Sequence, residues 1–169
     1  MSSKIREYLQ HSDRILIGIG EEITAKSDQD MRKRVYEALN NLLTGKNYYI
    51  VSLAEDDQMI DTPLDQARIV TPLYTEEEKG EQDWDTYLKW LSQTLNHELF
   101  ILELGAGFQY PQIIRFPFEK TAYFNQKSHF IRVHTKLYQV PGESAARSET
   151  IQADPGEWVL GIDSDARPC

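Results

Sequence analysis

The strongest constraint on the fold is a repeated alternation of short β-rich runs with segments of helical period. Strands are expected at residues 15–19, 48–53, 67–70, 99–104 and 130–133, with a weaker one at 150–152. This alternation is typical of a parallel sheet that is covered by helices. Because crossovers between parallel strands are right-handed, we expect a Rossmann-like, doubly wound α/β fold. Its mostly parallel sheet should have about five or six strands in the order 3-2-1-4-5-6, with helices on both faces.

The expected helices cover residues 29–44, 83–96 and 113–124, and a last one runs from Pro155 through Leu160. The first is the best signalled, because Val35, Leu39 and other apolar residues recur every three or four positions and Gly45 follows as a stop. Pro117 is expected to break or kink the third helix. Asp154 is expected to cap the last one.

The chain length of 169 residues predicts a single domain, 1–169. Residues 72–82 and 139–149 are polar and are expected to be linkers, and residues 163–169 are expected to fray. With 40% hydrophobic and 27% charged residues, the composition is that of an ordinary globular domain and excludes disorder throughout.

The net charge of the chain argues against a nucleic-acid partner. The chain has 18 basic and 27 acidic residues, a net charge of -9, which is the wrong sign for neutralising phosphates by counterion release. Residues 1–84 contain 10 basic against 17 acidic groups, so the excess lies mostly in the first half. We therefore expect no nucleic-acid partner.

The chain has one cysteine, Cys169, which permits neither an internal disulfide nor a zinc site built from cysteines. The first residues are polar and charged, and no apolar run approaches the length of a membrane span. We expect a cytoplasmic protein without a membrane partner.

Glycine turns follow two of the expected strands. Gly18 and Gly20 end the first strand, and Gly105 and Gly107 follow the strand at 99–104. Ligands of open α/β sheets bind where such turns lie side by side, if the first and fourth strands are neighbours. The alternative is that the glycines serve only to turn the chain, while Phe108 and Tyr110 pack on the core.

Glu21 and Glu22 come directly after the first glycine turn, and Ile23 stands where a third fingerprint glycine would be. Two carboxylates beside a pyrophosphate would repel it unless they point away. The spacing therefore leaves open whether a nucleotide binds here.

Metal-binding patterns are weak. The histidines His11, His97, His129 and His134 are never four residues apart, so no helical metal pair is expected. The acidic triplets at 55–57 and 76–78 lack the spacing of a calcium loop and are interpreted as solvated charges at a loop or helix start. His134 ends a strand, where it is either solvated or in contact with a ligand. We expect no metal.

Residues 99–134 have the sequence LFILELGAGFQYPQIIRFPFEKTAYFNQKSHFIRVH. This segment resembles bacterial sirtuin-like proteins, especially the short group associated with macrodomains. In that group an apolar strand ends in a glycine turn and leads into a Pro-Xaa-Ile-Ile-Arg-Xaa-Pro-Phe element. Residues 15–24, 49–56 and 67–72 resemble sirtuins less specifically. The resemblance implies a Rossmann-like sheet that binds NAD or ADP-ribose.

Carried over position by position, the resemblance places Gly18, Gly20 and Thr24 beside the phosphates and Gly105 and Gly107 at the adenosine half. Asp56 matches the aspartate of the family's Asn-Xaa-Asp element. His134 stands where sirtuins usually have an asparagine near the adenine ribose. Arg115 matches the family's arginine, whose role is either to hold the loop or to meet a phosphate.

The chain also departs from the family. Ala54 replaces the asparagine of the Asn-Xaa-Asp element, and Thr71-Pro72 stands where sirtuins have the catalytic His-Gly after the third strand. The zinc module with its four cysteines is missing, so no zinc is expected. Because the sirtuin mechanism needs a histidine base within hydrogen-bond reach, the resemblance implies a degenerate sirtuin without deacylase activity.

Three functions stay open on the sequence. The first is an NAD- or ADP-ribose-binding domain that has lost deacylase chemistry and has a nucleotide ligand, a protein partner or a second copy of itself as its partner. The second is an enzyme that cleaves NAD, as an ADP-ribosyltransferase or an NAD hydrolase, with a carboxylate such as Glu22 or Asp56 stabilising the developing ribosyl cation. The third is a protein-interaction module whose crevice is filled.

Overall fold

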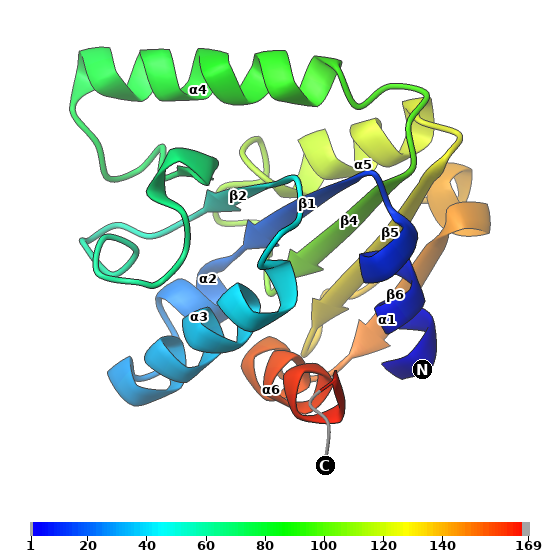
Figure 1. Ribbon diagram of the computed structural model, residues 1–169, viewed down its shortest axis with the longest axis horizontal. Helices are drawn as coiled ribbons and strands as arrows, with labels where there is room; N and C mark the ends of the chain where they lie inside the picture. Colours follow the sequence, from blue (N-terminus) through cyan, green and yellow to red (C-terminus); the bar gives the residue numbers. More distant parts are fainter. Residues whose placement is uncertain (1, 167–169) are drawn as a thin grey trace.

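The computed structural model describes residues 2–166 and contains one six-stranded, all-parallel sheet in the order β3-β2-β1-β4-β5-β6 (Figure 1). Its strands are β1 (Arg14–Ile19), β2 (Tyr48–Ser52), β3 (Ile69–Val70), β4 (Leu99–Leu104), β5 (Ser128–His134) and β6 (Ser148–Gln152). The expected α/β fold and strand order are confirmed. The sheet reverses its order between β1 and β4, so the carboxyl ends of these two strands form the switch point.

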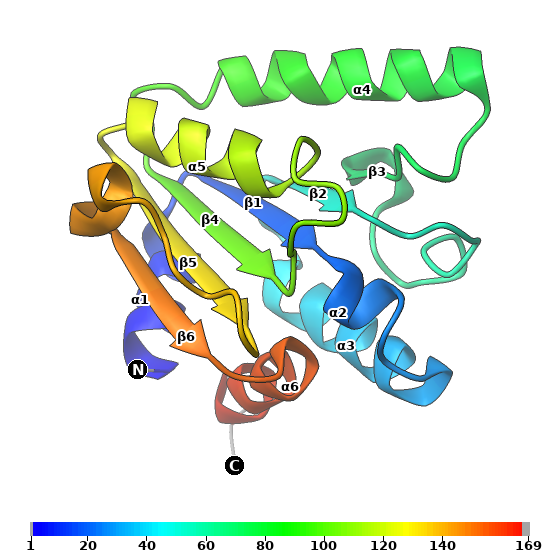
Figure 2. The ribbon, with the colours of Figure 1, turned by 180° about the vertical axis from the view of Figure 1, so that it is seen from behind.

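Helices cover both faces of the sheet (Figures 1 and 2). They are α1 (Ser2–His11), α2 (Glu21–Thr24), α3 (Gln29–Leu43), α4 (Glu77–Ser92), α5 (Arg115–Phe124) and α6 (Pro155–Ala166), with 3-10 turns at Gln66–Arg68 and Gly142–Arg147. One core cluster joins α1, α3 and α6 to the sheet, and a second joins α4 and α5 to the opposite face.

The local signals explain most helix ends. Asp28 caps α3 by accepting a hydrogen bond from the backbone N–H of Met31 at 2.8 Å, and Gly45 follows the helix with a φ of 79°. Asp154 caps α6 through the N–H of Glu157. Pro117 neither breaks nor kinks α5, because it lies in the first turn, where backbone N–H groups need no partner within the helix.

Several boundaries differ from expectation. Ala67 and Arg68, expected in a strand, belong to the 3-10 turn before β3, and the expected linker 139–149 contains the second 3-10 turn and the start of β6. Helix α1 was not expected, because its inward-facing positions are few: Ile5 and Leu9 are buried in an otherwise polar segment. Helix α4 starts at Glu77, inside the expected linker. Helix α6 continues to Ala166, so the expected frayed tail is helical where it is described. Residues 167–169 of that tail lie outside the described part of the chain.

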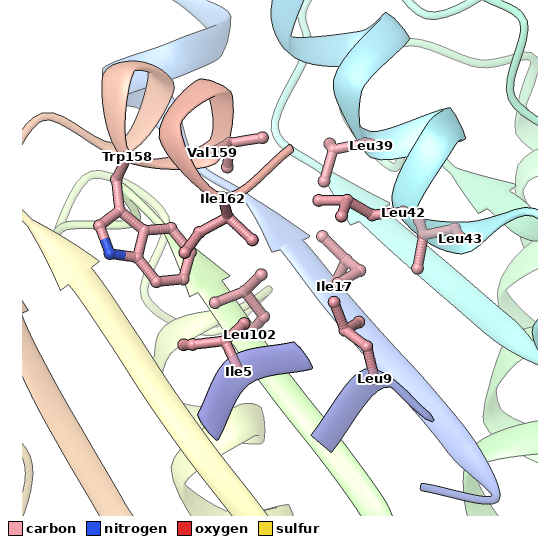
Figure 3. Close-up of a pocket in the computed structure, with 10 residues that line it drawn as sticks. All are labelled: Ile5, Leu9, Ile17, Leu39, Leu42, Leu43, Leu102, Trp158, Val159 and Ile162. Atoms are coloured by element: carbon pink, nitrogen blue, oxygen red, sulfur yellow. The ribbon is translucent and has the colours of Figure 1, made fainter. Parts of the chain in front are cut away.

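The face of the sheet that α1, α3 and α6 cover is closely packed with side chains. Figure 3 shows side chains from these helices and from β1 and β4 converging on a cavity of only about 10 Å³. Ile5, Ile17 and Leu102 are among its apolar lining residues. A space of this size holds about one water molecule, so this face serves packing.

Within residues 2–166, the structure contains no helix that is both long enough and apolar enough to span a bilayer.

Candidate functional site

The two glycine turns meet at the switch point, as the sequence predicts for neighbouring first and fourth strands. The Gly20 N–H donates to Leu104 O at 2.8 Å, and the Glu22 N–H donates to Gly105 O at 3.1 Å. A Cβ atom added at Gly20 would lie 2.3 Å from the backbone nitrogen of Ala106. The turns are therefore in direct backbone contact. We use the name crevice for this contact together with the side chains of Glu21, Glu22, His134 and Thr135, which lie around it.

The Glu21 side chain lies within the crevice and is hydrogen-bonded to the second glycine turn. Its Oε1 accepts a hydrogen bond from the Gly107 N–H at 2.8 Å, and the residue is only 8% exposed. A Cβ atom at Gly107 would lie 2.5 Å from this same oxygen. The other carboxylate oxygen, Oε2, is buried and has no hydrogen-bond partner among the described residues. A side chain of the protein thus occupies a backbone donor at the end of β4.

Glu22 reaches the next strand end. Its carboxylate accepts hydrogen bonds from the backbone N–H of Thr135, at 3.1 Å, and from the Thr135 hydroxyl. This close approach requires a glycine at position 105, because its φ is 74° and a Cβ atom there would lie 2.6 Å from Glu22 Cβ. The two glutamates therefore tie the β1 turn to the ends of β4 and β5.

His134, the last residue of β5, lies beside the same carboxylates. Its Nδ1 accepts hydrogen bonds from the backbone N–H groups of Lys136 and Leu137, at 3.0 and 2.9 Å, and lies 3.3 Å from Glu22 Oε1. Burial lowers the pKa of His134 below its usual 6.5, although Glu22 and Glu21 act in the opposite direction. With Nδ1 accepting, the neutral ring has its proton on Nε2.

Arg115 holds the loop around the crevice. It is 5% exposed and donates to Ala106 O at 3.0 Å and Leu137 O at 2.9 Å. Its guanidinium carbon lies 4.3 Å from the centre of the Phe108 ring. Of the two roles left open for Arg115, the structure supports the loop-holding one.

A buried ion pair supports this region from below. Arg132 donates to both carboxylate oxygens of Glu103 at 2.8 and 2.9 Å, and both side chains are fully buried. Arg132 also donates to Gln139 O and forms an ion pair with Glu119. Burial raises the pKa of Glu103 to about 7, against the opposing effect of the two arginines. The pair fixes β4 to β5 and to the loop that follows β5.

The other expected site residues lie farther from the crevice. Gly18 is inside β1 and faces α5, because a Cβ atom there would lie 2.7 Å from side-chain atoms of Ile114 and Phe118. Its place in the structure is explained by helix packing. Thr24 ends α2, and its carbonyl oxygen accepts a hydrogen bond from Gln58 Nε2 at 3.0 Å.

Asp56 lies on the loop after β2. Its Oδ1 accepts hydrogen bonds from the backbone N–H and the side-chain amide of Gln58, at 3.1 and 2.8 Å. These bonds to Gln58 lower the pKa of the Asp56 carboxyl. Asp56 lines a separate cavity near the end of β3. The structure therefore brings Gly20, Gly105, Gly107 and His134 together and leaves Asp56 outside that group.

The two aromatic residues after the second glycine turn differ, because Tyr110 packs against the core cluster under α4 and α5, as the alternative predicts, whereas Phe108 is largely exposed. Phe108 is 55% exposed, and Tyr110 donates its hydroxyl to Glu55 at 2.8 Å. Neither the contact of Thr135 with Glu22 nor the inward direction of Glu21 and Glu22 is predicted from the sequence. The available signal was the position of two carboxylates directly after a glycine turn.

The architecture and the paired glycine turns define a Rossmann-like α/β domain. No family model matches the chain, and no curated protein matches it. A solved structure from work on the structural basis for the mechanism and regulation of Sir2 enzymes matches with a TM-score of 0.59 and 12% sequence identity, covering 98% of each chain. The fold is therefore sirtuin-like, while membership of the short, macrodomain-associated group stays a prediction.

Proposed function

We propose that the protein is a sirtuin-like domain without deacylase activity whose crevice is filled, because Glu21 and Glu22 replace the phosphates of an NAD-type nucleotide. The observation that supports this most directly is the hydrogen bond from the Gly107 N–H to Glu21 Oε1, at 2.8 Å inside the crevice. Carboxylates and phosphates accept hydrogen bonds from the same backbone donors. A donor that already has an internal partner gains little from a second anion.

Electrostatics work in the same direction. A pyrophosphate placed at the β1 and β4 turns would lie beside the carboxylates of Glu21 and Glu22. Like charges at about 4 Å repel by about 4 kcal/mol at the effective dielectric constant of a protein surface. We therefore expect wild-type protein to bind NAD and ADP-ribose weakly.

The missing base supports the loss of deacylase chemistry. Thr71 follows β3, and its hydroxyl donates to Tyr74 O at 2.9 Å. His134 lies near the crevice, but its acceptor nitrogen already takes two backbone N–H groups. A general base needs a free lone pair aimed at the proton that it removes. Neither residue offers one.

A second candidate is a domain that does bind NAD or ADP-ribose, with Glu21 displaced by the ligand. The unpartnered Oε2 of Glu21 favours it, because an unsatisfied buried acceptor costs about 1–3 kcal/mol, more for a charged group. Movement of Glu21 would relieve this cost and expose the Gly107 N–H. In that case Gly20, Gly105 and His134 line the ligand, with Gly18, Thr24 and Asp56 as further contacts to be tested.

The two candidates differ in what wild-type protein does. Calorimetry and thermal shift with NAD, ADP-ribose and AMP should be run on wild type, Glu21→Ser and Glu22→Ser. Glu37→Ser is the matched control, because Glu37 is an exposed residue of α3. Ligand at one hundred times its dissociation constant stabilises a fold by about 2.7 kcal/mol. We expect such a shift with ADP-ribose in the two crevice variants and not in wild type or the control.

Saturable binding of ADP-ribose to wild type, with the same affinity as to Glu21→Ser, would overturn the first candidate and support the second. Failure of both folded crevice variants to bind would contradict the idea that the glutamates replace phosphates. Cooperative thermal unfolding establishes that each variant is folded. Nicotinamide release from NAD with an acetylated peptide, above a control without protein, would contradict the loss of deacylase activity.

A further inference from the structure

A second site lies on the same edge of the sheet but away from the glutamates. It is a cavity of about 650 Å³ beyond the end of β3, between the loop after β2 and the first turns of α4. Its lining includes Asp56 and Thr71 and none of the glycines or glutamates of the crevice. Cavities of about 300–1,000 Å³ hold ligands of drug size. We call it the β3 cavity.

Carboxylates dominate the charge of the β3 cavity. Asp56, Glu76 and Asp83 line it together with one cation, Lys79. Lys79 pairs with Asp83 at 2.8 Å, which leaves Asp56 and Glu76 without a cation among the lining residues. In the described part of the chain, the Glu76 side chain forms no hydrogen bond or ion pair, and it does not cap α4. Asp56 accepts two hydrogen bonds from Gln58, and Arg32, outside the lining, also lowers the pKa of the Asp56 carboxyl, so Glu76 is the lining carboxylate that no described cation compensates.

Apolar side chains form the rest of the lining. Ile60 is 56% exposed and Tyr74 is 43% exposed, although both belong to the cavity wall. Large apolar groups that stay exposed beside a hollow mark a surface on which burial of a partner is favourable. Met59 and Leu73 extend the same wall.

We propose that the β3 cavity binds an organic cation, an amine or guanidinium group carried on an apolar body. The cation balances Glu76, and the body covers Ile60 and Tyr74. Other ligand classes fit the lining less well. An anion would meet the carboxylate of Glu76, and an inorganic cation would leave the apolar wall exposed. This inference goes beyond the proposed function, because it does not depend on whether the crevice is filled.

Hexylamine, hexanol and hexanoate are matched probes with the same apolar body and different charge. We expect hexylamine to bind most tightly, hexanol more weakly and hexanoate not at all, measured by amide chemical shifts of residues that line the cavity. Added salt should weaken the binding of hexylamine and leave the binding of hexanol unchanged, because salt screens the charged contact. A blocked leucyl-lysine dipeptide separates two sources of the cation: tighter binding than hexylamine assigns it to a peptide side chain, and weaker binding to a small molecule.

Variants separate the contribution of charge from that of packing. Glu76→Gln should weaken hexylamine about two- to fivefold, as expected for loss of a partly exposed charge contact. Glu81→Gln is the matched control, because Glu81 is exposed on the same helix and does not line the cavity. Tyr74→Ala should weaken hexylamine and hexanol by the same factor.

Three results would overturn the proposal. The first is hexanoate binding as tightly as hexylamine. The second is an equal effect of Glu76→Gln and Glu81→Gln. The third is hexylamine shifts spread over the acidic surface instead of the residues around Tyr74 and Glu76. Each can occur whether or not ADP-ribose binds, so failure here is distinct from failure of the proposed function.

Discussion

The crevice and the β3 cavity lie on the same edge of one sheet, and both contain carboxylates, but they use them differently. In the crevice, Glu21 is buried, the Glu22 side chain is only 8% exposed, and the two accept hydrogen bonds from Gly107 and Thr135. In the β3 cavity, Glu76 is exposed, and its side chain accepts no hydrogen bond from any residue that the structure describes. The comparison shows that acidic residues near strand ends can serve as internal ligands in one place and remain open to an external cation in another.

Burial explains the difference. A carboxylate taken out of water must be compensated by hydrogen bonds or a cation, so the crevice glutamates are engaged by backbone donors. In the β3 cavity, Glu76 is exposed to water and needs no protein donor. We expect substitutions below and within the crevice to change stability strongly, and those in the β3 cavity to change binding alone.

The largest expected effect belongs to the ion pair below the crevice. Arg132→Leu leaves the Glu103 carboxylate buried without its main partner, which should cost about 3–5 kcal/mol in the free energy of unfolding. The loss should be greater at about pH 8 than at about pH 5, because the folded variant takes up a proton on Glu103 that the unfolded chain releases. Urea denaturation at both pH values measures this. Equal losses would contradict an unpaired carboxylate, and Arg132→Leu with Glu103→Leu should recover much of the stability.

The next effect tests the contact between the two glycine turns. Gly20→Val places a side chain against the backbone of Ala106, so we expect a loss of about 3 kcal/mol. Gly142→Val is the control, because no atom lies within 4 Å of a Cβ atom there. Chemical denaturation of both variants gives the difference. Similar stability of the two would show that the turns do not touch.

A smaller effect concerns the protonation of His134. Since burial lowers its pKa below 6.5, the unfolded chain binds more protons than the folded chain as the pH falls through this range, and stability decreases. Between about pH 7.5 and pH 5.5 wild type should lose up to about 1 kcal/mol more than His134→Asn. Thermal or urea unfolding across this range checks the prediction. A gain in stability toward acid that His134→Asn abolishes would contradict it.

The smallest stability effect is expected at the β3 cavity. Lys79→Met breaks an exposed pair with Asp83 and should change the free energy of unfolding by less than about 0.5 kcal/mol. It also frees a carboxylate, so hexylamine should bind about twofold more tightly. Titration with hexylamine and a denaturation curve test both parts. Weaker binding of the amine would indicate that Lys79 contacts the ligand.

The sequence predicts the sheet better than its borders. Strand order follows from alternation and handedness, and Asp28 and Gly45 mark the ends of α3 through local chemistry. Helix α1 lacks such signals: it is short, and Ile5 and Leu9 provide most of its buried surface. Its place depends on packing against α6 and the sheet, which local periodicity does not report.

The candidate site is predicted only in outline. The glycine turns and His134 can be found from their positions at strand ends, whereas the direction of Glu21 cannot. Its partner, Gly107, is 86 residues away, so the hydrogen bond exists only once β1 and β4 are neighbours. Gly18 shows the opposite case, because a glycine that fits a phosphate turn in the sequence is used to pack α5 against β1.

The amide signal of Gly107 tests most directly whether Glu21 holds the Gly107 N–H in place of a phosphate. We expect ADP-ribose to leave this signal unchanged in wild type and to move it saturably in Glu21→Ser. Saturable movement of the Gly107 signal in wild type, with the same affinity as in Glu21→Ser, would contradict the account.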